Sequence, residues 1–118
     1  MNTAKTTDEL MSDRASVLTE LIEVAAGAIV SRVLASSGGG NVTLFAFDRG
    51  QGLSDHTAPF DALVQVVDGQ LDVTIGGAEI AVNAGEIVRM PAGIVHSVHA
   101  PEPARMLLTM LREPKVKA

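Results

Sequence analysis

The sequence predicts a single all-β domain, folded as an antiparallel sandwich or a closed barrel. Short apolar stretches follow one another from residue 28 to residue 111, and glycine, proline or asparagine interrupts the chain between most of them. Two of these interruptions, Asp68-Gly69 and Gly76-Gly77, are two-residue turn signals of the kind that joins neighbouring antiparallel strands. The chain has 118 residues, of which 47% are hydrophobic, and this suits one domain around one core.

Each expected strand lies between two such interruptions. The glycine-rich segment 36–41 separates the first two strands and predicts a hairpin with a long connection. Proline cannot donate a hydrogen bond to a neighbouring strand, so Pro59, Pro91 and Pro101 mark places where other strands end. We therefore expect strands at residues 28–35, 42–48, 53–57, 61–67, 70–75, 78–82, 86–90, 95–100 and 105–111.

The first 27 residues are expected to form an extension in front of a barrel domain at residues 28–118. Residues 1–16 are mostly polar, and we expect them to be frayed or loosely docked. The apolar residues between Asp8 and Val24 are spaced so that they could line one face of a helix, with Thr7 as its cap. Residues 20–24 could equally form a short edge strand, and the sequence leaves both alternatives open.

Composition argues against several classes of function. The formal net charge is −5, the basic residues form no stripe, and Tyr and Trp are absent, so we expect no nucleic-acid partner. The absence of cysteine excludes disulfides, thiolate nucleophiles and cysteine-based zinc sites. No apolar run approaches the ~20 residues of a membrane span, and the polar N-terminus is unlike a signal peptide. We therefore expect a cytoplasmic protein without a membrane partner.

The last expected strand is apolar on both faces. Met106, Leu108 and Met110 alternate on one face, and Leu107 and Leu111 lie on the other. A strand with one face in water should alternate apolar with polar residues. We therefore expect the N-terminal segment or a second subunit to cover the second face, and we favour a homodimer.

The stretch 85–100 resembles a motif of the cupin family, whose members are small jelly-roll β-barrels. The second cupin motif has the form G-x5-P-x-G-x2-H-x3-N. Gly85, Pro91, Gly93 and His96 match its first four marked positions, and Ala100 stands where the family has asparagine. The resemblance extends over about residues 28–112, and it implies that the expected strands form a cupin barrel.

The stretch 50–69 resembles the first cupin motif, G-x5-H-x-H-x3-4-E-x6-G, less fully. Gly50, His56 and Gly69 match it. Ala58 stands where the family has its second histidine, and Ala62 stands where it has glutamate. The resemblance thus implies a metal site that keeps two of its four ligand positions, His56 and His96.

Two histidines from different strands that point into one interior could share a divalent cation, for which we consider Zn, Ni, Fe or Mn. A third ligand could come from Asp61 or Gln65 if either side chain turned inward. Alternatively, His56 and His96 hydrogen-bond to each other, to water or to a ligand without a metal. A third possibility is a metal that binds only weakly or during purification.

The sequence therefore supports a binding protein for a small molecule, with a degenerate metal site inside the barrel. A metal-dependent enzyme of the dioxygenase or isomerase type is the alternative, and a purely structural or regulatory dimer is a third. His99 is expected at the surface, because it lies three residues from His96 on the same strand. The residues expected to line the pocket are His56, Ala58, Ala62, Met90, His96, Met106 and Met110.

Overall fold

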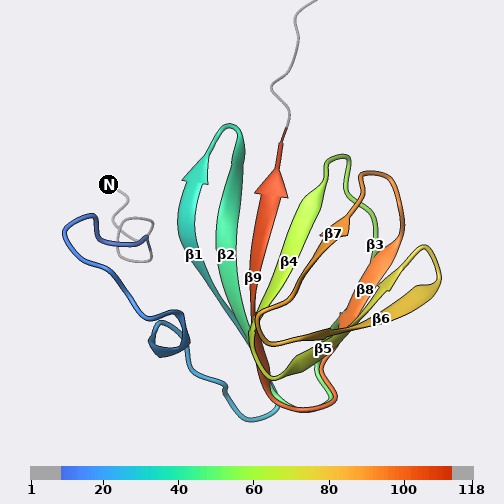
Figure 1. Cartoon of the computed structure of the whole chain (residues 1–118), viewed down its shortest axis with the longest axis horizontal. Coiled ribbons are helices and arrows are strands. Elements are labelled where there is room, and N and C mark those ends of the chain that lie inside the picture. Colours follow the sequence, from blue (N-terminus) through green and yellow to red (C-terminus); the bar gives the residue numbers. More distant parts are fainter. Residues whose placement is uncertain (1–8, 113–118) are drawn as a thin grey trace, which may run out of the picture.

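The structure, a computed structural model, describes residues 9–112 and confirms the predicted all-β fold (Figure 1). Its five-stranded sheet has the strand order β1-β2-β9-β4-β7, and its four-stranded sheet has the order β3-β8-β5-β6. All neighbouring strands in these sheets are antiparallel. The strands are β1 (Ile29–Ser37), β2 (Gly40–Phe47), β3 (Gly52–His56), β4 (Ala62–Asp68), β5 (Gln70–Ile75), β6 (Ala78–Asn83), β7 (Ile87–Met90), β8 (His96–His99) and β9 (Ala104–Leu111).

The turn signals differ in what they connect. Gly76-Gly77 joins β5 and β6 as a tight hairpin, with Ile75 paired to Ala78 across it, as predicted. The predicted Asp68-Gly69 hairpin is wrong, because β4 and β5 belong to different sheets. Here the chain turns from one sheet to the other. Gly69 has φ +77°, and a Cβ at this position would lie only 2.6 Å from the carbonyl oxygen of Pro103, so both conformation and space require glycine.

The connection between β1 and β2 is also shorter than expected. Ser37 pairs with Gly40, so the two strands extend into the glycine-rich segment and leave a two-residue turn. The register of this hairpin shifts once, between Val33 and Ala35. Strand pairing, which depends on both partners, therefore continues through residues that the composition alone had marked as loop.

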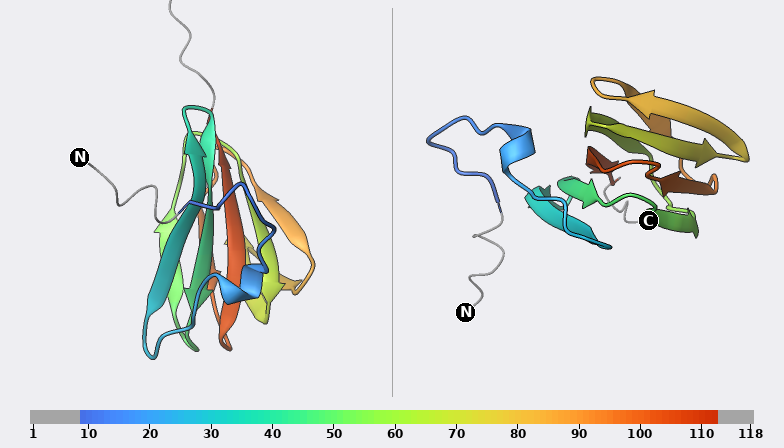
Figure 2. Two further views of the ribbon diagram at one scale, coloured as in Figure 1. Left: turned by 90° about the vertical axis from the view of Figure 1, so that its left-hand side faces the viewer. Right: turned by 90° about the horizontal axis from the view of Figure 1, so that it is seen from below.

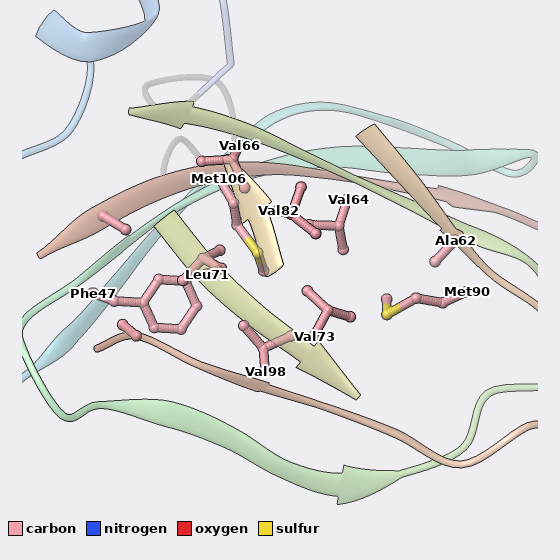
Figure 3. Packing of buried hydrophobic residues seen from close by; sticks show 12 residues of the cluster. Phe47, Ala62, Val64, Val66, Leu71, Val73, Val82, Met90, Val98 and Met106 are labelled. Carbon is pink, nitrogen blue, oxygen red and sulfur yellow. The ribbon is translucent and has the colours of Figure 1, made fainter. Parts of the chain in front are cut away.

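The main core lies between the two sheets and is built largely from inward-facing residues of their strands (Figure 3). On β4, for example, Ala62, Val64 and Val66 are buried, whereas Gln65 between them is exposed. Only one aromatic side chain, Phe47, is fully buried in this core, and aliphatic residues fill the rest. Its buried members are Phe47, Ala62, Val64, Val66, Leu71, Val73, Val82, Met90, Val98, Ala100, Ala104 and Met106.

A second, smaller cluster lies on the outer face of the five-stranded sheet, and the N-terminal segment covers it. Figure 2 (left panel) shows this segment crossing the outer face. Its Ile22 packs with Leu34 of β1 and with Leu44 and Ala46 of β2, and Leu107 of β9 borders the cluster. The N-terminal segment is therefore one cover for the second apolar face of the last strand. The homodimer stays a prediction.

The N-terminal segment forms neither the α-helix nor the edge strand that the sequence allowed. Within the described residues it contains one 3-10 turn, Leu18–Glu20. The proposed cap, Thr7, lies outside the described residues. Two arginines of the barrel donate hydrogen bonds to backbone carbonyls that would otherwise accept hydrogen bonds within a helix. Arg32 donates to the carbonyl of Leu21 (3.2 Å), and Arg105 donates to the carbonyl of Ile22 (3.0 Å). No helix in the described part of the chain could span a membrane.

Candidate functional site

Two histidines meet where β3 ends and β8 begins. His56 is the last residue of β3 and His96 the first of β8, and the two are paired in the antiparallel register. This register shifts by one residue between Leu53 and His56. Leu53 packs against the main core, so strict alternation would turn His56 outward. The shift reverses that parity and directs His56 toward His96, as β-bulges commonly do beside functional sites.

The two imidazole rings contact each other through their Nε2 atoms. These atoms are 3.0 Å apart, and the rings meet at 75° with centroids 4.2 Å apart. Each Nδ1 lies against a backbone carbonyl: that of His56 is 2.7 Å from the oxygen of Ser54, and that of His96 is 3.1 Å from the oxygen of Ile94. A carbonyl oxygen only accepts, so we assign the ring proton to Nδ1 in both histidines. Both Nε2 lone pairs are then available to a shared proton or another cation.

The two histidines differ in their surroundings. His96 is only 4% exposed, whereas His56 is exposed. Burial lowers the pKa of His96, and the nearby His56 lowers it further, because a charge on either ring opposes a charge on the other. The hydrogen bond to the Ile94 carbonyl acts in the opposite direction and raises the pKa of His96. The lowered pKa of His96 favours its neutral form near neutral pH.

The histidine pair forms the polar end of an apolar cavity of about 90 Å³ between the two sheets. Of the residues that the structure describes, only the two histidines contribute ionisable groups to its lining. All seven residues that the sequence assigned to a pocket border this cavity. The complete lining is Leu53, His56, Ala58, Phe60, Ala62, Met90, His96, Val98, Met106, Leu108 and Met110.

Four of these residues were not predicted. Val98 and Leu108 share their strand faces with His96 and Met106, two residues away, so this spacing was a usable signal. Leu53 was hidden by the register shift in β3, and Phe60 lies in the connection before β4, where no periodicity applies. A larger surface hollow, about 340 Å³, lies beside the β1–β2 turn and the end of β9, and none of the described side chains that border it is ionisable.

The two candidates for a third metal ligand lie outside the cavity. Both carboxylate oxygens of Asp61 are engaged: the backbone N–H of Ala92 donates to one (2.8 Å) and Arg89 to the other (3.1 Å). The Ala92 N–H, followed by Arg89, lowers the pKa of Asp61. Gln65 is exposed and points away from the core. His99 is likewise exposed, as expected for a surface histidine.

The donor set does not suit the divalent ions that the cupin resemblance implied. Among residues 9–112, no group of three or more His, Cys, Asp or Glu side chains could hold a metal ion. Zn, Ni, Fe or Mn would find two neutral nitrogen donors from the chain and no carboxylate. Sites for these ions usually combine three or four nitrogen, oxygen or thiolate ligands. The two histidines alone leave such a shell incomplete.

Comparison with known proteins agrees with the barrel fold. Residues 43–110 match the family model described as a cupin domain. A conserved protein of unknown function from Streptococcus pyogenes is 29% identical, with TM-score 0.85 over 90% of this chain and 93% of that one. A cupin superfamily protein from Desulfitobacterium hafniense is 25% identical, with TM-score 0.83 over 88% and 95%.

A Cupin 2 conserved barrel domain protein from Leptotrichia buccalis is 36% identical, with TM-score 0.77 over 80% of this chain but only 46% of its own length. Comparison with curated proteins gives no match. The similarity to solved structures thus covers most of the present chain, and none of the three descriptions names a substrate.

Proposed function

The chain belongs to the cupin domain family, and from that premise we propose that it binds a small molecule inside its barrel. The observation that carries the proposal is the cavity itself: an apolar space between the sheets that ends in two imidazoles. Binding sites for small molecules are typically apolar hollows with a few polar groups that fix the orientation of the ligand. In this cavity the histidine pair supplies the polar groups that can orient a ligand.

The size of the cavity limits the ligand. An apolar cavity of ~150 Å³ holds benzene, so the volume of about 90 Å³ here accepts a body of about four or five heavy atoms. The apolar side chains of the cavity suit a ligand with a short aliphatic body. The imidazoles suit a ligand with one oxygen-bearing head group. Because each histidine presents an Nε2 atom to the cavity end, a hydroxyl head could donate a hydrogen bond to its lone pair, and a carbonyl or carboxylate head could accept one from a ring that also carries a proton on Nε2.

The test uses three probes of similar size and different head groups: propionate, isobutanol and butanone. Saturation-transfer NMR with the full chain should detect at least one of them. Ala62→Leu should abolish the signal, because the larger side chain occupies the cavity between Met90 and Met110. Ala81→Leu, the same change at an exposed position of β6, should leave it unchanged. Circular dichroism confirms that both variants are folded.

Two results would overturn the proposal. One is the absence of signal from all three probes. The other is a signal that persists in Ala62→Leu. If that variant does not fold, His56→Ala at the exposed end of β3 replaces it, and it should weaken the probe that depends on the head-group contact. The enzyme alternative gains no specific observation from the described residues, and we do not propose it.

A further inference from the structure

A second hollow lies next to the barrel cavity, and one side chain borders both spaces. This hollow has a volume of about 290 Å³ and lies between the connection from β3 to β4 and the end of β9. Phe60, which is half-buried, lines the hollow as well as the barrel cavity. A movement of this ring would therefore join the two spaces. The hollow is lined by Pro59, Phe60, Asp61, Ala92, Leu111 and Arg112.

The Phe60 ring lies where the fold allows it to move. It belongs to the connection between β3 and β4, so the alternation of a strand does not fix its direction. Its ring contacts Arg112, whose guanidinium carbon lies 5.8 Å from the ring centroid. A cation–π contact at an exposed position is weak. A ligand that binds the guanidinium can therefore replace this contact.

Arg112 is the residue of this hollow that can bind an anion. It is exposed, and none of the described carboxylates forms an ion pair with it. Its backbone N–H donates to the carbonyl of Gly39 (2.8 Å), which fixes the start of the side chain beside the hollow. The other ionisable residue of the described lining, Asp61, already accepts hydrogen bonds from Arg89 and from the N–H of Ala92. The guanidinium therefore remains as a planar set of donors that matches a carboxylate.

We propose that the barrel cavity and this hollow together bind one aliphatic carboxylate. Its carboxylate lies on Arg112, its chain passes Phe60, and an oxygen-bearing far end lies at the histidine pair. This inference rests on the proposed function, because it uses the same cavity, and it adds the class of the ligand. The ring of Phe60 moves aside as the chain enters, and the guanidinium exchanges its contact with the ring for the carboxylate. Arg112 thus provides the preference for an anion in a protein whose net charge is −5.

The two volumes set the length of the ligand. The barrel cavity, at about 90 Å³, accepts about four or five heavy atoms. A carboxylate on Arg112 lies outside that cavity, so the chain must continue past Phe60 into the hollow of about 290 Å³. In a hydroxy- or oxo-substituted acid of about eight carbon atoms, about half of the chain lies in the cavity and the rest crosses the hollow. The hydroxyl or carbonyl oxygen at the buried end then meets His56 and His96.

The test is an NMR titration of the full chain with 8-hydroxyoctanoate and with 1,8-octanediol, which has the same carbon chain but no charge. The acid should bind at least about threefold more tightly than the diol, because its carboxylate adds a charge-assisted contact at an exposed arginine. Raising the NaCl concentration from about 20 mM to about 300 mM should weaken binding of the acid and leave the diol unchanged. Octanoate, which lacks the hydroxyl, should bind about threefold less tightly than 8-hydroxyoctanoate.

Matched variants test each contact. Arg112→Gln should remove the advantage of the acid over the diol, whereas Arg14→Gln makes the same change at an exposed arginine of the N-terminal segment and should keep it. Phe60→Ala removes the shared wall, so the ring no longer has to leave its cation–π contact. This variant should raise the affinity for 8-hydroxyoctanoate relative to isobutanol by at least about twofold. Circular dichroism confirms that each variant is folded, and the exposed Arg112→Gln keeps the test decisive if Phe60→Ala is not.

Three results are incompatible with the proposed ligand class: equal affinity for the acid and the diol, an advantage of the acid that persists in Arg112→Gln, or a Phe60→Ala variant that loses affinity for the acid relative to isobutanol. Isobutanol is small enough to report on the barrel cavity alone. If isobutanol binds and any of these results is found, the proposed function stands and the ligand class is wrong. If propionate, isobutanol and butanone all fail to bind, the proposed function itself is wrong, and this extension of it fails as well.

Discussion

Filling the barrel cavity should stabilise the protein while removing its binding space. Ala62 is 3% exposed and borders the cavity, so a leucine here extends into space that the surrounding side chains leave free. At ~24 cal/mol for each Å³ of cavity, a volume of about 90 Å³ costs the folded state about 2 kcal/mol. Restricting the leucine side chain costs about 0.5–1 kcal/mol. We therefore expect Ala62→Leu to raise the free energy of unfolding by about 1 kcal/mol.

Urea unfolding followed by far-UV circular dichroism measures this change, because the chain has no Trp or Tyr for fluorescence. The midpoint should rise without a change in the denaturant slope, and the melting temperature should rise by about 4 °C. Ala81→Leu adds the same atoms at an exposed position and should stay within about 0.5 kcal/mol of the unchanged chain. A loss of more than 1 kcal/mol in Ala62→Leu, typical of an overfilled core, would refute the inferred space.

Four further predictions concern stability and assembly. Arg105→Leu should lower the free energy of unfolding by about 2 kcal/mol, because it removes a mostly buried guanidinium that joins β9 to Asp68 and the N-terminal segment. A smaller loss of unfolding free energy in Arg105→Leu than in the exposed Arg89→Leu would contradict this. The lowered pKa of His96 contributes stability that is present above its unfolded pKa of 6.5 and is lost as the pH falls through the lower folded pKa. Thermal melts from pH 7.5 to 5 should therefore show a weaker acid dependence in His96→Gln than in His99→Gln, and equal dependence would exclude this cause. Gly69→Ala should cost about 1–3 kcal/mol in urea unfolding because of its positive φ, and a neutral effect would show that the turn can relax. Sedimentation should give twice the mass of one chain, and a monomer at 100 µM would end the homodimer prediction.

Local sequence signals predicted most of the strands, because the side-chain alternation of a strand and the turns at its ends depend on neighbouring residues. Alternating apolar residues and glycine or proline interruptions are sufficient to mark β5, β6 and the Gly76-Gly77 hairpin between them. The same signals could not distinguish a hairpin from a crossing at Asp68-Gly69. That choice depends on β9, which lies beside β4 in the five-stranded sheet, more than thirty residues later in the sequence. Pairing between distant segments leaves no trace in a two-residue turn.

The candidate site was also predictable only in part. The spacing of Gly85, Pro91, Gly93 and His96 identified His96, and the two-residue period of β9 identified Met106 and Met110. These three residues border the cavity. The same reasoning left Asp61 open as a ligand. Asp61 instead accepts hydrogen bonds from Ala92 and Arg89, and this outward arrangement depends on a connection some thirty residues away.

The family resemblance identified His56 and His96 as a pair, and the sequence by itself determined an all-β domain with its turn residues. These features follow from the side-chain period of a strand and from the conformational limits of glycine and proline. Only the tertiary structure decided that the two rings face each other, because a one-residue register shift in β3 reverses the direction of His56. Such a shift arises from the match between β3 and β8, and neither strand specifies it alone.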